Sequence, residues 1–159
     1  MKEIKLTQGK VALVDDEDYD ELSVFKWYCN LGYAVRRRRT FEEKGVPIIR
    51  MHVQIMGKIE GLDVDHINGN RSDNRRENLR HCTAAQNSAN MRKYRGGSKY
   101  KGVYWHKFGR RWCAKFFAGG KAVHIGSFKT EDDAARAYNI AVKSVRGEFA
   151  VLNEIGGAT

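Results

Sequence analysis

The segment DVDHINGNRSDNRRENLRHCTAAQN, residues 63–87, concentrates side chains that could hydrolyse a phosphodiester bond. That reaction needs a base that deprotonates water and a cation that stabilises charge on the phosphate and the leaving oxygen. His66 suits the base, because the unperturbed pKa of histidine lies near neutrality. The oxygen atoms of Asp65 and Asn87 suit Mg²⁺ or Mn²⁺, whereas imidazole or thiolate ligands would favour zinc-like metals.

The secondary structure around these residues decides whether their side chains meet. Adjacent strand residues point to opposite faces, so Asp65 and His66 serve one substrate only where the strand ends or bends. The Asn68-Gly69 pair favours such a turn. A strand, a short returning strand and a helix that carries Asn87 are predicted for the segments LDVDHI, ENLRHCT and AAQNSANM.

The same segment also suits a polar surface loop. Asn and Asp side chains commonly hydrogen-bond to neighbouring backbone groups and so cap their own turns. Residue types and spacing leave both interpretations open, a hydrolytic site and an Asx-rich loop.

The overall charge favours a polyanionic partner. Twenty-nine Lys and Arg residues oppose nineteen Asp and Glu residues among 159, a net charge of +10. The apolar runs are far too short for a membrane span, and the first ten residues, MKEIKLTQGK, lack the apolar core of a secretory signal. We therefore expect a cytoplasmic protein with no membrane partner.

The cysteines point to the same compartment. Cys29, Cys82 and Cys113 are widely spaced and odd in number. This argues against a disulfide framework and against a Cys-x-x-Cys zinc site. We expect no structural zinc and a reducing cell interior.

A change in composition near residue 96 separates two basic parts. The stretch RKYRGGSKYKG places Gly96, Gly97 and Ser98 among basic residues, and Gly/Ser composition predicts a flexible joint. Its basic flanks could follow a phosphate backbone. Residues 1–95 carry 18 basic and 14 acidic residues, and residues 96–159 carry 11 and 5.

The first fifty residues are typical of short strands. An apolar run at Val11–Val14 precedes an acidic stretch, Asp15–Glu21. A run of cations, Arg36–Arg39, follows a group of strand-forming residues. It suits either a solvated loop or a contact with phosphate.

Three strands and one helix are predicted after the joint. YKGVYW, RRWCAKFFA and AVHIGSF are rich in aromatic and β-branched residues, and glycine-containing turns separate them. Thr130 is a good N-cap for the helix that follows, and Gly147 a natural C-terminal residue. An apolar stripe predicts that this helix covers one face of a three-stranded antiparallel sheet. The stripe comprises Ala134, Ala137, Tyr138, Ala141, Val142 and Val145.

Alternation along the strands assigns their side chains to two faces. Trp112, Ala114 and Phe116 suit the helix, with Val123 and Ile125 inward beside them. The other face combines cations with aromatic groups, which suits a DNA groove, since cations meet phosphates and planar groups pack on sugars and base edges. An ordinary open sheet with scattered charges is the alternative. The outer face is expected to hold Tyr104, His106, Phe108, Arg111, Cys113, Lys115, Phe117, Ala122 and His124.

Residues 98–153 resemble the plant APETALA/ethylene-response-factor DNA-binding domain. The resemblance is carried by SKYKGVYW, the Gly-x-x-Trp of GRRWCAKF, and IGSFKTEDDAARAYNIAVKSVRGEFAVLN. It implies a sheet that enters the DNA major groove. Several contact positions are Arg, Trp or Glu in the plant proteins, and Phe and Ala cannot make the bidentate contacts of Arg to guanine. The mode of binding therefore carries over better than the target sequence. The contact positions fall on Tyr104, His106, Phe108, Lys115, Phe117, Ala122 and His124.

Residues 51–92 resemble the HNH endonucleases with the ββα-metal fold, particularly the homing-type members of phages and introns. The order Asp-His-Ile-Asn-Gly-Asn, Asn-Leu-Arg and Asn carries the resemblance. It implies that Asp65 and Asn87 are metal ligands and that His66 is the general base. It also implies that Asn78 is the central Asn, which ties the loop to the strand that carries the base.

The third motif position departs from many HNH enzymes, which have His where this chain has Asn87. A branch of the family uses Asn there as a ligand. A neutral amide is a weaker ligand, so the resemblance implies a loosely held, exchangeable cation. His52 matches a His commonly found upstream. We favour a structural role for His52 and His81.

Together these observations predict an α+β protein in three parts. Residues 1–50 form a strand-rich region that packs on an HNH ββα-metal core, residues 51–95, and residues 96–159 form the APETALA-type domain. The expected activity is site-specific cleavage of double-stranded DNA by a monomeric homing endonuclease in a phage or bacterial host cell. The alternative is a DNA-binding regulatory protein with an inactive nuclease fold. Cations that could hold phosphates near the site are Arg75, Arg76 and Arg80.

Overall fold

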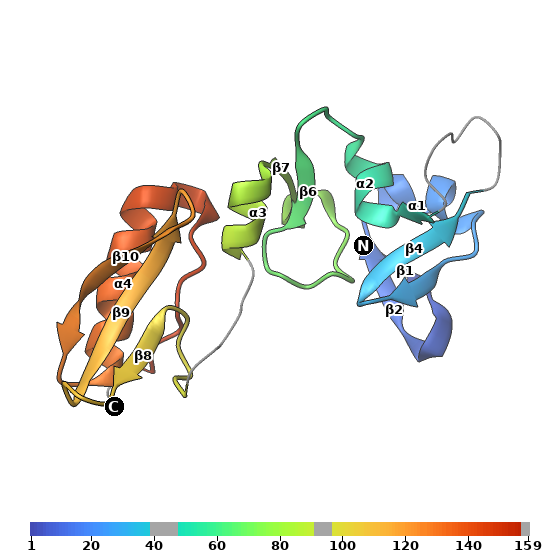
Figure 1. Cartoon of the computed structure of the whole chain (residues 1–159). Coiled ribbons are helices and arrows are strands. Elements are labelled where there is room, and N and C mark those ends of the chain that lie inside the picture. Colours follow the sequence, from blue (N-terminus) through green and yellow to red (C-terminus); the bar gives the residue numbers. More distant parts are fainter. Residues whose placement is uncertain (39–47, 91–96, 157–159) are drawn as a thin grey trace. The chain divides into compact units, whose positions relative to one another are not determined.

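The computed structural model describes residues 1–38, 48–90 and 97–156 of the chain (Figure 1). The chain is a mixed α and β protein with small antiparallel sheets and few helices. It divides into two compact units, residues 1–87 and residues 88–159. Two sequence predictions concern residues outside the described ranges. They are Arg39, the last residue of the arginine run, and the flexible joint at Gly96.

The first unit holds seven strands among the described residues. They are β1 (Lys2–Lys5), β2 (Val11–Val14), β3 (Tyr28–Asn30), β4 (Tyr33–Arg37), β5 (Ile48–Arg50), β6 (Asp63–His66) and β7 (Leu79–Cys82). Its helices are α1 (Asp16–Ser23) and α2 (Met51–Met56), with single 3₁₀ turns at Thr7–Gly9 and Arg76–Asn78. Helix α3 (Ala84–Asn90) crosses the division between the units.

The strands of the first unit form three antiparallel sheets, β1–β2, β3–β4–β5 and β6–β7. The hairpin between β3 and β4 turns through two residues, Leu31 and Gly32, whose φ angles of 50° and 86° are both positive. Such turns match the twist of the paired strands, and the second position suits glycine. This hairpin places Tyr33 at the start of β4.

The acidic stretch is helical from Asp16 to Glu21, so the expectation of strands alone in the first fifty residues was wrong at this point. Asp15 is the N-cap residue of α1, and three acidic residues occupy the first turn. Negative charge there is stabilised by the helix dipole. Leu22 is buried and Tyr19, three residues earlier, packs against the same core, as a helical period requires.

One hydrophobic core joins the N-terminal strands to the β6–β7 region. Trp27, Leu22 and Met51 are among its most deeply buried side chains. Leu79 of β7 belongs to the same cluster, which also includes residues of β1, β2 and α2. The strand-rich region therefore packs on the segment that carries the His66 motif. The indole nitrogen of Trp27 donates to the Leu22 carbonyl at 2.8 Å, so burial leaves this group paired.

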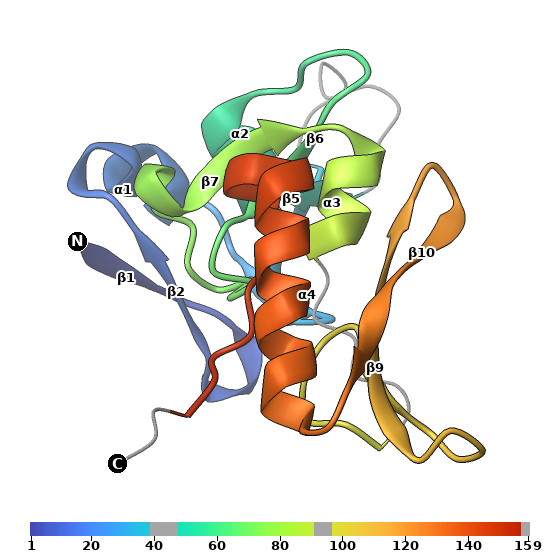
Figure 2. The same cartoon turned by 90° about the vertical axis from the view of Figure 1, so that its left-hand side faces the viewer.

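The second unit has the predicted three strands and one helix. Its sheet has the order β10 (Lys121–Phe128), β9 (Arg111–Ala118), β8 (Val103–His106), all antiparallel. Helix α4 (Glu131–Arg146) lies along one face of it (Figures 1 and 2), and a 3₁₀ turn, Gly147–Phe149, follows. Thr130 caps α4 by accepting a hydrogen bond from the Asp133 amide at 3.1 Å.

The apolar stripe of α4 differs from the prediction at one end. Ala134, Tyr138 and Val142 are buried as expected, and Ala135 is buried too. Val145 is 59% exposed, so its assignment to the stripe was wrong. It lies in the last turn of the helix. No described helix is both long enough and apolar enough to span a membrane.

Candidate functional site

The Asp-His pair lies where β6 ends. Asp65 pairs with Arg80 and His66 with Leu79 across the β6–β7 ladder. The backbone then turns, and the Gly69 amide donates to the His66 carbonyl at 2.9 Å. Both side chains are buried, with 8% of Asp65 and 4% of His66 exposed. Strand β6 therefore ends directly after the Asp-His pair, and both residues are still paired with β7.

Asn78 joins the loop after β6 to the start of β7. Its side-chain oxygen accepts from the Asn68 amide at 3.0 Å, and its side-chain nitrogen donates to the Asp73 carbonyl at 2.8 Å. Its backbone carbonyl accepts from the Ile67 amide at 2.8 Å. These contacts hold the loop close to His66 on one side and to β7 on the other.

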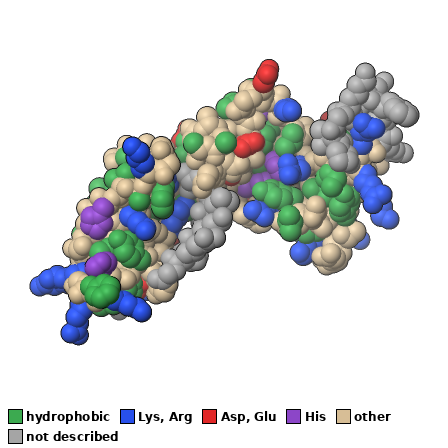
Figure 3. Space-filling view, in the orientation of Figure 1, with side chains coloured by type: hydrophobic (Ala, Val, Ile, Leu, Met, Phe, Trp, Pro, Cys, Tyr) green, Lys and Arg blue, Asp and Glu red, His purple; other side chains and the backbone are tan. Residues whose placement is uncertain are grey.

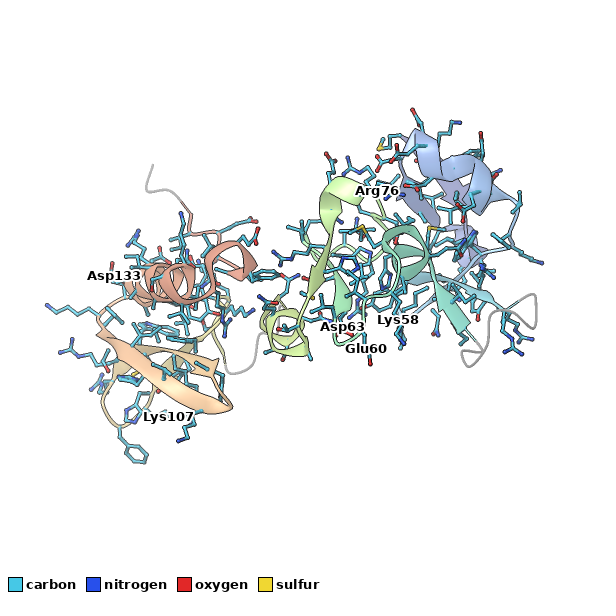
Figure 4. The ribbon with its side chains drawn as sticks, turned by 90° about the horizontal axis from the view of Figure 1, so that it is seen from above. Lys58, Glu60, Asp63, Arg76, Lys107 and Asp133 are labelled. Carbon is cyan, nitrogen blue, oxygen red and sulfur yellow. The ribbon has the colours of Figure 1, made fainter. Side chains whose placement is uncertain are left out.

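Helix α3 brings Asn87 to β6. Thr83 and Gln86 form a reciprocal cap at its start. The backbone N–H of Gln86 donates to Thr83 Oγ1, and the backbone N–H of Thr83 donates to Gln86 Oε1. The Asn87 side-chain nitrogen donates to Asp63 Oδ2 at 3.2 Å. Asp63, labelled in Figure 4, lies two residues before Asp65 and so on the same face of β6.

The oxygen atoms around this face suit a hard divalent cation. Asp65 supplies a carboxylate and Asn87 an amide oxygen, and Asp63 adds a second carboxylate. The Asp65 carboxylate also receives a hydrogen bond from Arg80 at 3.2 Å. No cluster of three or more His, Cys, Asp or Glu side chains that could hold a metal ion occurs in the described ranges. Asp65 and Asn87 thus offer the kinds of oxygen donor that a hard divalent cation accepts.

His66 lies in a small aromatic cluster. Its ring centroid is 4.7 Å from that of His52 and 5.9 Å from that of Tyr33. His66 Nε2 lies 3.3 Å from Asn74 Oδ1. Burial lowers the pKa of His66, and the charge of Arg71 lowers it further, while the Asn74 contact and nearby carboxylates oppose the shift. The ring is therefore held in its neutral, basic form at neutral pH.

His52 contributes packing to this cluster from helix α2. Only 4% of it is exposed, and its Nδ1 atom has no hydrogen-bond partner in the described structure. Burial, followed by the charges of His66 and Arg50, lowers its pKa to about 3. A neutral, desolvated ring fits the structural role that the sequence favoured.

The three arginines expected to meet phosphate are all paired with carboxylates. Arg75 lies 2.8 Å from Asp73 and 2.6 Å from Glu77. Arg76, labelled in Figure 4, lies 2.6 Å from Asp18 of α1. Arg80 is paired with Asp65. Arg76 joins the loop to α1 and Arg80 joins β7 to β6, whereas Arg75 pairs within its own loop; phosphate binding is not tested by these contacts.

Arg71 is different and was missed by the sequence analysis. Its guanidinium donates to the Leu31 carbonyl at 2.8 Å and lies 4.4 Å above the Tyr33 ring. In the described part of the chain it forms no carboxylate ion pair. The side chain is exposed, and its charge acts on His66. The signal in the sequence was its place in the loop between the Asp-His pair and Asn78.

The outer face of the C-terminal sheet carries the strand residues that alternation predicted, except that Phe108 lies in the turn after β8 and not on the strand. Tyr104 pairs with Cys113, His106 with Arg111, and Ala122 with Phe117, and His124 lies opposite Lys115. Figure 3 shows His, Lys or Arg, and hydrophobic side chains gathered over this sheet. Cys113 is buried despite its place on this face.

Lys115 lies at the centre of this face. Its ammonium nitrogen is 4.7 Å from the Tyr104 ring centroid and 5.9 Å from that of Phe117. Phe117 is 59% exposed, and Phe108, in the turn after β8, is 98% exposed. Aromatic rings next to a cation suit contacts to sugar, base edge and phosphate.

Val123 and Ile125 follow the inward prediction only in part. Val123 pairs with Phe116 and so faces the helix, but it lies on an edge strand and is 39% exposed. The register shifts between His124 and Gly126, where the strand is irregular. Ile125 is partly buried against the core of the second unit.

Comparison with known proteins shows the family to which the chain belongs. The HNH endonuclease family profile matches residues 51–89. An uncharacterized HNH endonuclease of Acanthamoeba polyphaga mimivirus is 31% identical over 153 residues, which cover 93% of this chain and 77% of that protein. The chain belongs to the HNH endonuclease family.

The family match spans β6, β7 and nearly all of α3, so the motif residues lie within the segment that the family shares. Asp65, His66 and Asn78 are brought together around the β6–β7 hairpin, and α3 carries Asn87 to β6.

Over part of its length, the chain is also similar to plant proteins. The AP2-like ethylene-responsive transcription factor AIL5 of Arabidopsis thaliana is 38% identical over 84 residues, 48% of this chain and 15% of that protein. The AP2-like ethylene-responsive transcription factor PLT2, also of Arabidopsis thaliana, is 46% identical over 61 residues, which cover 37% of this chain and 11% of that protein. The chain thus spans only a small share of these plant relatives.

Proposed function

We propose that this HNH endonuclease is a site-specific, homing-type enzyme that cleaves double-stranded DNA with one divalent cation and a histidine base. The observation that carries the proposal is the arrangement of β6, β7 and α3, in which Asp65 and His66 end one strand and Asn87 reaches that strand from the helix. This order of two strands and a helix is compatible with a ββα-metal site. The chain's membership of the HNH endonuclease family and its basic composition support DNA as the substrate.

Asp65 and Asn87 would hold the cation, with Mg²⁺ or Mn²⁺ favoured by their oxygen donors. When bound, such an ion would stabilise charge on the phosphate and the leaving oxygen. Asp63 lies on the same face and would add negative charge. Asp65 would exchange its contact with Arg80 for the cation, which favours a weak, exchangeable site.

His66 would accept the proton of the attacking water. A general base must be unprotonated at working pH, and burial lowers the pKa of His66 in that direction. Asn78 would keep the loop after β6 in place through its two side-chain hydrogen bonds. The role of Asn78 is therefore to position the strand end that carries the base.

Arg71 would meet the phosphate. It is exposed, and its planar group is oriented by the Leu31 carbonyl and the Tyr33 ring near His66. Arg75, Arg76 and Arg80 would each have to leave a carboxylate to do the same. A hydrogen-bond donor that is already oriented does not have to move when negative charge develops on the phosphate in the transition state.

The C-terminal unit would act as an APETALA-type DNA-binding domain that docks through the outer face of its sheet. Lys115 and Arg111 would contact phosphate, and Tyr104, Phe108 and Phe117 would pack against sugars and bases. His106, Ala122 and His124 complete this face. Tethering a modest binder to a weak nuclease raises the effective concentration of each at the target.

A plasmid-cleavage assay tests the proposal. Wild-type protein should cut plasmid DNA with Mg²⁺ or Mn²⁺, and His66→Ala should lose roughly 100-fold or more in rate. His81→Ala is the matched control, because His81 is also on the β6–β7 hairpin but its ring contacts the Gly57 carbonyl. Intact DNA with every divalent cation tested would refute the nuclease, and equal cutting by His66→Ala would refute the base. Sequencing gels of the products would report the strand and the site.

One observation favours the alternative, a DNA-binding regulatory protein with an inactive nuclease fold. Arg80 contacts the Asp65 carboxylate and Asn87 donates to Asp63, so both intended metal ligands have partners within the protein. If this alternative holds, the protein would bind DNA tightly and cleave none of it. Its melting temperature would not rise with Mg²⁺ or Mn²⁺.

A further inference from the structure

Asn74 is a completely buried polar residue in the loop between β6 and β7, and its side chain contacts His66. A polar group in this position requires hydrogen-bond partners, because an unpaired amide away from water is costly. Its side chain has two described partners, the Ser72 carbonyl and the His66 ring. Neither the motif nor the proposed reaction assigns it a role.

The contact with Ser72 fixes the orientation of the side-chain amide of Asn74. The Asn74 side-chain nitrogen donates to the Ser72 carbonyl at 3.2 Å. A carbonyl can only accept, so the amide nitrogen must face Ser72 and the amide oxygen must face His66. The two ends of the amide are thus distinguished by their partners.

The orientation of the amide in turn fixes the histidine. Asn74 Oδ1 lies 3.3 Å from His66 Nε2, and an amide oxygen can only accept. His66 Nε2 must therefore carry a hydrogen. A neutral imidazole has one ring hydrogen, so Nδ1 carries the lone pair.

The N-terminal hairpin holds Asn74 in place. The backbone N–H of Asn74 donates to the Leu13 carbonyl at 2.8 Å, and the backbone N–H of Leu13 donates to the Ser72 carbonyl at 2.8 Å. Leu13 and Asp73 form a parallel bridge. Leu13 lies in β2 between Ala12 and Val14, both of which are buried in the core. Strand β2 is thereby joined through one loop to the ring of His66.

We propose that Asn74 is a positioning residue that holds His66 in the tautomer protonated at Nε2, so that Nδ1 is the atom that accepts the proton from water. The catalytic part of this inference rests on the proposed function of His66. The positioning part concerns the ring alone, and it assigns the region before residue 50 a part in forming the site.

Nitrogen NMR of the histidine rings tests the positioning part directly. Full-length, ¹⁵N-labelled protein without metal, at one neutral pH, should show His66 protonated at Nε2. Asn74→Leu, which has a similar size but no acceptor, should shift His66 toward the other tautomer. Asn74→Asp keeps an acceptor oxygen and should retain the original tautomer. Asn70→Leu is the control, because Asn70 belongs to the same loop but its side chain accepts from the Ser72 amide rather than facing His66.

Cleavage kinetics test the consequence for the reaction. Asn74→Leu should lower kcat by roughly 10- to 100-fold with KM nearly unchanged, and Asn74→Asp should recover most of that loss. The inference is overturned if wild-type His66 is protonated at Nδ1, or if Asn74→Leu leaves the tautomer unchanged. The wild-type spectrum decides the first point even where a variant fails to fold. Absence of wild-type cleavage would refute the proposed function and not the tautomer.

Discussion

The guanidinium of Arg80 lies 3.2 Å from the Asp65 carboxylate, in a pair that is largely shielded from water. Asp65 is the residue that the motif assigns to a metal, so the protein places its own cation where a divalent ion would bind. Removing one partner of a buried pair is costly, because the other charge keeps its desolvation penalty. The relationship predicts competition between Arg80 and the metal.

Arg80→Gln should therefore lower the melting temperature in EDTA and increase the stabilisation given by Mg²⁺ or Mn²⁺. The loss without metal should be up to about 3 kcal/mol. Thermal melts with and without each cation measure both effects. Arg76→Gln serves as control, since Arg76 pairs with Asp18 and Glu17, away from Asp65. An equal response of the two variants to metal would count against a cation site at Asp65.

Arg71→Ala should reduce kcat/KM for DNA cleavage by roughly 10- to 100-fold, because the structure orients this exposed cation near His66. Arg71→Lys should recover only part of the loss, since a lysine cannot reproduce a planar guanidinium on the Tyr33 ring. Arg75→Ala provides the comparison for the arginines that face carboxylates. A cleavage rate within twofold of wild type for Arg71→Ala would remove Arg71 from the site.

Stability should fall in acid because of His52. The pKa of its buried ring is lowered to about 3, whereas the unfolded chain has an ordinary histidine pKa near 6.5. Between these values the unfolded state binds more protons, so the free energy of unfolding falls as pH decreases from about 6.5 to about 3. The loss attributable to this ring is about 5 kcal/mol over the whole window.

His52→Phe keeps an aromatic ring and removes the titration. Its free energy of unfolding, from urea denaturation at several pH values, should depend less steeply on pH in that window than that of wild type. At neutral pH the two proteins should differ much less than they do near pH 4. Identical pH dependence of the two proteins would show that His52 is not buried in its neutral form.

Lys115→Ala should weaken DNA binding and reduce the steepness of its salt dependence. Lys115 lies among aromatic rings on the outer face of the C-terminal sheet, and each lost phosphate contact lowers the slope of log affinity against log salt by about 1. Lys143→Ala is the matched control, because Lys143 is an exposed cation on α4. Fluorescence anisotropy at several salt concentrations gives both slopes. Equal slopes for the two variants would argue against docking through this face.

Much of the fold follows from short-range patterns. The strands β8, β9 and β10 were predictable because aromatic and β-branched residues alternate between glycine turns, and Thr130 marked the start of α4. Strands β6 and β7 and helix α3 match the predicted strand, returning strand and helix, and the Asn68-Gly69 pair marked the turn after β6. The acidic helix α1 was missed, because its few apolar residues give a weak helical period against many charges.

The sequence by itself determined which side chains are available for chemistry. It predicted His66 as a base, Asp65 and Asn87 as oxygen donors, and an aromatic, basic sheet face, because these predictions depend on residue type, order and strand alternation. The tertiary structure alone decided the partners of those groups. Arg80 meets Asp65, Arg71 rests on Tyr33, and β2 holds Asn74 against His66. Each contact joins residues that only the folded chain brings together, and charge pairing and burial depend on distances that spacing along the sequence does not contain.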